Sequence, residues 1–121
     1  METQRAKRKH LLLTQEIREK LPPLYNSEKH PEKEAIAMVK FFSPYSQWTW
    51  YAVEFDGEDT FWGLVDGFEM EYGYFSYSEL EQVCGFGGTI PMVERDCHWT
   101  PRSVKEIEKE IAENLSRAVR G

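Results

Sequence analysis

Residues 48–75 read WTWYAVEFDGEDTFWGLVDGFEMEYGYF, three runs of eight residues separated twice by the dipeptide Asp-Gly. The dipeptides are Asp56-Gly57 and Asp66-Gly67. Asp-Gly between alternating apolar runs is among the strongest short-range signals for a two-residue β-hairpin turn. The stretch therefore predicts three antiparallel strands in meander order, over residues 48–55, 58–65 and 68–75.

Two-residue turns would set the register of these strands. Phe55 would oppose Glu58 and Val65 would oppose Phe68, and because side chains alternate along a strand, this register sorts them onto two faces. The apolar face, which we expect to be the core, holds Trp48, Trp50, Ala52, Phe61, Gly63, Val65, Phe68, Met70, Tyr72 and Tyr74, with Trp50 covering Gly63. The other face mixes aromatic and acidic residues: Thr49, Tyr51, Val53, Phe55, Trp62, Leu64 and Phe75 with Glu58, Thr60, Glu69 and Glu71.

The same register places Glu54 directly opposite Asp59, and like charges that face each other across strands are destabilising. One interpretation is that both carboxylates lie in water at the open end of the sheet, or that residues 56–59 form a longer loop that shifts the register. The other is a carboxylate pair that holds a cation or shares a proton for acid/base chemistry. The sequence leaves both interpretations open.

The flanking segments predict an α+β fold, an antiparallel meander sheet of four or five strands packed by a C-terminal amphipathic helix, with two short helices. Residues 35–42 form a further strand, and residues 26–34 a loop. Thr14 caps a short helix to Lys20, and Ser76 opens a capping box that starts another. A helix begins at Thr100-Pro101 and runs to about Val119, because its apolar residues recur at spacings of three and four: Val104, Ile107, Ile111, Leu115 and Ala118.

The chain of 121 residues suits one domain over residues 11–121, preceded by a disordered basic tail over residues 1–10. The net charge is −6, and residues 41–94 hold ten Asp or Glu and no Lys or Arg. An acidic sheet argues against binding phosphates and favours a cationic partner. Nucleic acid is expected only through the tail, at Arg5, Lys7, Arg8 and Lys9.

No stretch resembles a secretory signal or is long enough to span a membrane, and two cysteines do not make a disulfide framework. We therefore expect a cytoplasmic protein.

Few residues suggest a chemical site. Cys84, Cys97 and His98 are zinc-type ligands at poor spacing, and the glycine-rich turn after Cys84 lacks the residues of a phosphate loop, so we expect no metal and no cofactor. Arg95 is expected to be an ion-pair partner. If it faced the sheet carboxylates, however, a polar site would form from Glu54, Asp59, Arg95 and Asp96.

The central segment resembles a bacterial domain-of-unknown-function family of small proteins encoded on plasmids, integrative elements and phage-like islands. The likeness covers about residues 11–101, and no activity or site residue follows from it. The first ten residues and the C-terminal helix lie outside it. It rests on Leu12-Leu13-Thr14, Leu21-Pro22, Phe41-Phe42, Trp48-Thr49-Trp50-Tyr51, Glu54-Phe55-Asp56-Gly57, Asp59-Thr60-Phe61, Gly63-Leu64-Val65, Gly67, Glu69, Gly73-Tyr74-Phe75-Ser76, Glu79-Leu80 and Glu94-Arg95-Asp96.

The sequence thus favours a non-enzymatic accessory protein of a mobile element. It would bind a basic partner protein through an acidic, aromatic sheet face formed by Tyr51, Trp62, Glu58, Glu69 and Glu71. The alternative is a small enzyme or ligand-binding protein that uses Glu54, Asp59, Arg95 and Asp96, with or without a divalent cation.

Overall fold

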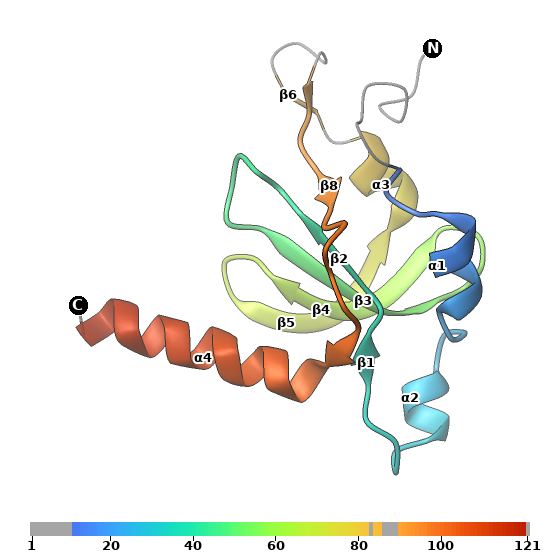
Figure 1. Ribbon diagram of the computed structural model, residues 1–121, viewed down its shortest axis with the longest axis horizontal. Coiled ribbons are helices and arrows are strands. Elements are labelled where there is room, and N and C mark those ends of the chain that lie inside the picture. The colour runs from blue at the N-terminus through green and yellow to red at the C-terminus, as the bar shows by residue number, and fades with distance from the viewer. Residues whose placement is uncertain (1–10, 83, 86–89, 121) are drawn as a thin grey trace.

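The computed structural model describes residues 11–82, 84, 85 and 90–120, and it has the expected α+β fold (Figure 1). Five strands form an antiparallel sheet in the order β5-β4-β3-β2-β8, and β1–β9 and β6–β7 are two separate two-stranded pairs. The strands are β1 (Ile36–Ala37), β2 (Val39–Phe42), β3 (Thr49–Phe55), β4 (Thr60–Asp66), β5 (Met70–Ser76), β6 (Cys84–Gly85), β7 (Ile90–Pro91), β8 (Glu94–Arg95) and β9 (Arg102–Ser103). The helices are α1 (Gln15–Lys20), α2 (Asn26–Lys29), α3 (Tyr77–Gln82) and α4 (Val104–Arg120).

The meander is confirmed, but the register predicted from two-residue turns is wrong. In the first hairpin one carboxylate oxygen of Asp56 accepts hydrogen bonds from the backbone N–H groups of Glu58, Asp59 and Thr60, at 2.8, 2.8 and 3.0 Å. Residues 56–59 lie between the bounds of β3 and β4, which is the longer loop that the sequence left open. Phe55 pairs with Phe61, whereas a two-residue turn would have paired it with Glu58.

The second turn is also longer than expected. Asp66 pairs with Met70 across a three-residue loop, and Val65 pairs with Glu71 instead of Phe68. The odd number of loop residues reverses the alternation along β5. Four aromatic or long apolar side chains that were assigned to the core are consequently exposed: Phe68, Met70, Tyr72 and Tyr74.

A β-bulge at Val53 completes the departure from the expected pairing. Ala52 pairs with Gly63, but the next paired residue on β3 is Glu54, which faces Trp62 and not Asp59. Beyond such a bulge the side chains exchange faces. Val53 therefore packs in one core cluster and Phe55 in the other.

Both faces of the sheet contribute to the core, because helices pack on both. One cluster joins the face of Ala52 and Phe61 to α1 and α3, and the other joins the face of Tyr51 and Leu64 to α4. The first face was expected to be the core and the second was not. The aromatic rings of the core pack in two layers, one on each face of the sheet.

Two glycines of β4 and its turn allow close approach of other groups. A Cβ on Gly63 would lie 1.9 Å from the carbonyl oxygen of Tyr51, so this glycine lets the backbone of β3 approach closely. It is Gly67 that lies under a tryptophan, since a Cβ there would lie 2.4 Å from the ring of Trp48.

The short helices follow their local signals with one exception. Thr14 accepts a hydrogen bond from the N–H of Ile17 and Ser76 accepts one from the N–H of Glu79, so both predicted caps are confirmed. The exception is α2, which forms where a loop was predicted. Among the described residues, no helix is both long and apolar enough to cross a membrane.

The C-terminal helix begins at Val104, after β9, and not at residue 101. Val104 and Ile107 are buried against the sheet, whereas Leu115 is 66% exposed. Figure 1 shows the C-terminal part of α4 extending beyond the sheet. Only the first turns of the predicted apolar stripe therefore belong to the core.

Candidate aromatic and acidic cleft

A cleft of about 300 Å³ opens where α2 meets the face of the sheet that α4 also covers. Its lining combines three aromatic side chains with two carboxylates: Tyr25, Ser27, Glu28, Glu54, Trp62 and Tyr74. The residues come from the start of α2 and from β3, β4 and β5. None of these six carries a positive charge.

Glu54 lies at the base of this cleft and is only 2% exposed. Its Oε1 accepts a hydrogen bond from the N–H of Tyr25 at 2.8 Å, and its Oε2 accepts one from the N–H of Ser27 at 2.7 Å. Hydrogen bonds of backbone N–H groups to a carboxylate are stronger than neutral ones and compensate its burial. Glu54, on β3, thus accepts the N–H groups at the N-terminal end of α2 and places a carboxylate at the base of the cleft.

Tyr25 precedes α2 in a left-handed conformation, with φ of 71°. This region is uncommon for residues other than glycine, and side chains held there are often found at functional sites. The hydrogen bond to Glu54 supports the conformation. The Tyr25 ring therefore stands at the edge of the cleft, 52% exposed.

Tyr74 forms the facing aromatic wall and is 57% exposed. The neighbouring Tyr25 hydroxyl raises the pKa of the Tyr74 hydroxyl, and the negative charges of Glu54 and Glu28 raise this pKa further. With two carboxylates and no positive charge among its six lining residues, the cleft is electronegative.

Trp62 is the third aromatic wall, and β5 and α4 hold it in place. Its ring stacks on Tyr72, with 5.5 Å between the centroids and 17° between the planes. The Tyr72 hydroxyl donates to Glu108 of α4, and burial together with this carboxylate raises the pKa of Tyr72. The cleft is thereby linked to the first part of α4.

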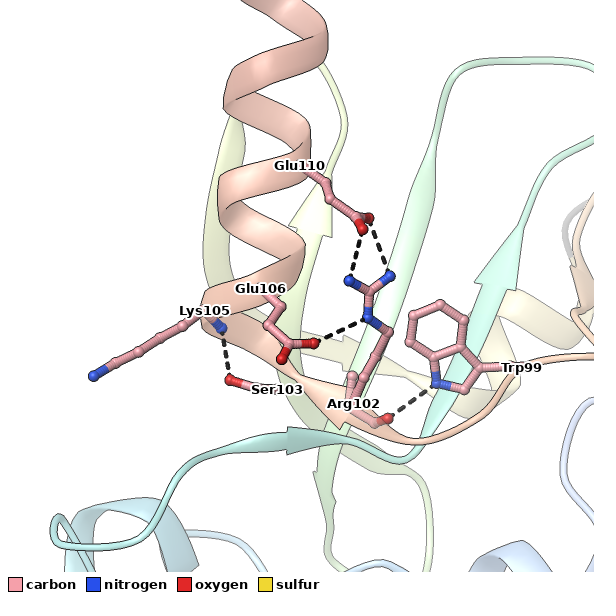
Figure 2. Close-up of polar contacts among 7 residues, drawn as sticks. Trp99, Arg102, Ser103, Lys105, Glu106 and Glu110 are labelled. Atoms are coloured by element: carbon pink, nitrogen blue, oxygen red, sulfur yellow. Dashed lines mark hydrogen bonds and ion pairs between the residues drawn. The ribbon is translucent and has the colours of Figure 1, made fainter.

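The base of α4 is anchored by a network around Arg102 (Figure 2). The guanidinium group donates to both oxygens of Glu110, at 3.0 and 2.7 Å, and lies 3.6 Å from Glu106. It also lies 5.9 Å from the ring centroid of Trp99, whose indole N–H donates to the carbonyl of Ala37. This network fixes α4 against the sheet and the β1–β9 pair.

The five residues expected to bind a partner do not form one surface. Tyr51 is buried beneath Trp99, with 5.6 Å between the ring centroids. Glu71 pairs with Val65 and lies on the face of the sheet opposite Trp62. Glu58 and Glu69 are exposed in the two hairpin loops, so only Trp62 of the five lines the cleft.

The four residues of the alternative polar site are distributed over three places. Glu54 is in the aromatic cleft. Asp59 accepts from the hydroxyl groups of Ser76 and Ser78, at 2.6 and 2.9 Å, and the bond from Ser76 lowers the pKa of Asp59. Arg95 and Asp96 line a second cleft.

The second cleft has a volume of about 140 Å³ and contains charges of both signs. The Nε of Arg95 donates to the carbonyl oxygen of Leu11 at 2.8 Å, and Asp96 lies 3.9 Å from the ammonium of Lys40. Cys97 is an exposed thiol on its wall. Lys20 also contributes to the lining.

Some predicted features fall outside the described residues, namely the basic tail and the central part of the glycine-rich turn at 86–89. The same holds for the side chain of Cys84. Within the part of the chain that is described, no three His, Cys, Asp or Glu side chains are placed to hold a metal ion.

Sequence reasoning missed four residues of the aromatic cleft, Tyr25, Ser27, Glu28 and Tyr74. Tyr25, Ser27 and Glu28 lie in or beside the segment taken as a loop, and the wrong register placed Tyr74 in the core. One signal was present, the carboxylate of Glu54 in an otherwise apolar strand, which required a partner that the sequence did not reveal.

The fold and the cleft define a small α+β protein with a concave, electronegative and aromatic site on one face of its sheet. The chain belongs to the family described as a protein of unknown function (DUF2958), whose model matches residues 12–116. The match includes most of α4, so the expectation that this helix lies outside the family is wrong. No curated protein and no solved structure matches the chain significantly.

Proposed function

We propose that the protein recognises a cationic group of a partner protein and that the aromatic and acidic cleft receives this group. The observation that carries the proposal is the lining itself, three aromatic rings around a buried carboxylate. Aromatic faces attract cations within about 6 Å of the ring centroid, and more strongly where the site is partly desolvated. The cleft therefore replaces the broader sheet face that the sequence favoured.

The charge distribution supports the same choice of partner. Residues 41–94 contain ten acidic residues and no Lys or Arg, and they include the three strands of the cleft. Such a surface accelerates association with a basic partner and suppresses association with nucleic acid.

The proposal includes a non-enzymatic, accessory role on a plasmid or other mobile element. Its support is the sequence resemblance described above. A protein of this kind would act by occupying the surface of its partner.

The test compares Tyr74→Ala with Tyr45→Ala, two tyrosines of similar exposure, 57% and 53%, of which only the first lines the cleft. Each tagged protein is used to capture partners from a lysate of its host at low and at physiological ionic strength. We expect a basic protein that wild type and Tyr45→Ala retain at low salt, that Tyr74→Ala loses, and that dissociates as salt rises. Equal capture by both variants would refute the role of the cleft.

A ligand-binding or enzymatic role at Arg95 and Asp96 is the second candidate, because these two residues line a cleft with charges of both signs. Its volume of about 140 Å³ is half that of the aromatic cleft. Ligand sites usually measure about 300–1,000 Å³, so the geometry favours the aromatic cleft. A thermal-shift screen of Arg95→Gln against wild type with small anions and divalent cations tests the second candidate.

A further inference from the structure

We propose that the aromatic and acidic cleft selects a quaternary ammonium group, the head group of a trimethylated lysine side chain, over an unmodified lysine. This inference rests on the proposed function, since it specifies which cationic group of the partner enters the cleft.

The strongest acceptor of the cleft is already occupied. Both oxygens of Glu54 accept backbone N–H groups, and the side chain is almost fully buried. The other polar groups of the lining are the hydroxyl groups of Tyr25, Ser27 and Tyr74 and the carboxylate of Glu28. The base of the cleft therefore offers negative charge without an exposed acceptor, and three of its wall residues offer aromatic rings.

The two ligands differ in the hydrogen bonds to water that they lose on entering the cleft. A lysine ammonium has three N–H donors, and burial without acceptors for them is costly. A trimethylammonium group has no donor to satisfy, and its methyl groups gain apolar contact with the rings. Aromatic-lined sites with a nearby negative charge consequently suit quaternary ammonium groups.

Glu28 is the carboxylate of the lining that remains accessible, since it is exposed at the rim, on α2. A lysine could pair with it there, but exposed ion pairs contribute little in water. We therefore expect Glu28 to add long-range attraction for either cation and to leave the discrimination to the three rings.

The experiment titrates the ¹⁵N-labelled full chain with two matched probes, Nα-acetyl-Nε-trimethyl-lysine methylamide and Nα-acetyl-lysine methylamide. The backbone signals of Tyr25 and Ser27 and the indole signal of Trp62 report on the cleft. We expect these signals to shift with the trimethylated probe and its affinity to exceed that of the lysine probe by about tenfold, because only the lysine probe has N–H donors that lose water in the cleft.

Two controls identify the origin of the discrimination. The neutral isostere 3,3-dimethylbutanol has the shape of the head group without its charge, and we expect it to bind at least about tenfold more weakly than the trimethylated probe. Tyr74→Phe keeps the ring and should keep the preference, whereas Tyr74→Leu should reduce it, and Tyr45→Leu should leave it unchanged. Because Tyr74 is exposed, amide spectra of all variants should retain the wild-type dispersion.

The outcomes separate the two proposals. If the lysine probe binds the cleft as tightly as the trimethylated probe, the quaternary selectivity is refuted and the cationic function stands. If neither probe shifts the cleft signals at millimolar concentration, both are refuted. If tetramethylammonium alone binds as tightly as the trimethyl-lysine probe, the head-group chemistry is supported and the ligand is a small quaternary amine instead of a protein side chain.

Discussion

Glu54→Gln is the substitution that tests the structural basis of the cleft most directly. Glu54 is buried, and each of its oxygens accepts one backbone N–H, from Tyr25 and from Ser27. Glutamine is nearly isosteric, but it presents one oxygen and one NH₂ group to the same two donors. One of the two N–H groups therefore loses its acceptor and faces another donor.

The magnitude follows from the two contacts. A hydrogen bond to a charged group contributes about 1.5–3 kcal/mol, and a neutral one about 1 kcal/mol. The substitution removes one charged hydrogen bond and weakens the other, so the free energy of unfolding should fall by about 3 kcal/mol. In urea this corresponds to a midpoint lower by about 1–3 M.

The assay is equilibrium urea unfolding followed by tryptophan fluorescence, with hydrogen exchange of the Tyr25 and Ser27 amides as a local readout. Exchange at both amides should accelerate more than at the core of β4, because α2 depends on Glu54. Glu58→Gln is the matched control, an exposed carboxylate in the adjacent loop, and should change stability by less than about 0.5 kcal/mol. A Glu54→Gln protein as stable as Glu58→Gln would refute the claim that Glu54 organises the cleft.

Three further predictions concern the core and one loop. Gly63→Ala should cost at least about 2 kcal/mol, because its Cβ would collide with a carbonyl oxygen, whereas Gly73→Ala, directly opposite in β5 with open space around it, should change stability by less than about 0.5 kcal/mol in the same assay. Ile107→Ala should lower the free energy of unfolding in urea by about 3 kcal/mol, since Ile107 is buried between α4 and the sheet. A loss below about 1 kcal/mol would contradict its place in the core. The hydrogen bond from Ser76 lowers the pKa of Asp59 below its ordinary value of 3.8. The ionised carboxylate therefore stabilises the fold above that pH, and this stabilisation is lost as the pH falls through the lowered pKa. Ser76→Ala should therefore be less stable than wild type at neutral pH, and the difference should shrink at about pH 2; a constant difference would contradict it.

Local signals predicted most of the elements. Caps such as Thr14 and Ser76, the apolar stripe of α4 and the alternating strands each depend on residues a few positions apart, and these elements appear in the structure. Fold class was accessible for the same reason. The two Asp-Gly dipeptides correctly marked the turns, but a turn position alone did not give the turn length.

The registers failed for a physical reason that lies in side-chain hydrogen bonding. The carboxylate of Asp56 captures three backbone N–H groups and lengthens the first loop, and this competes with the tighter turn that Asp-Gly allows. In the second turn there are three residues instead of two. Because strand side chains alternate with a period of two, this one extra residue moves side chains such as Tyr74 to the other face. The candidate site residues on β5 were therefore misplaced, while those on β3 and β4 were assigned to the right strands.

By itself, the sequence determined the α+β class, the meander order, the acidic character of the sheet and the position of most helices, since each depends on composition or on neighbours along the chain. Only the tertiary structure decided the register, the formation of α2 and the aromatic and acidic cleft. The reason is that these depend on contacts between distant residues, above all the two hydrogen bonds that Glu54 accepts from Tyr25 and Ser27, 29 and 27 positions away. No local pattern specifies such a contact, because the free energy that favours it arises only when the strand and the loop are brought together.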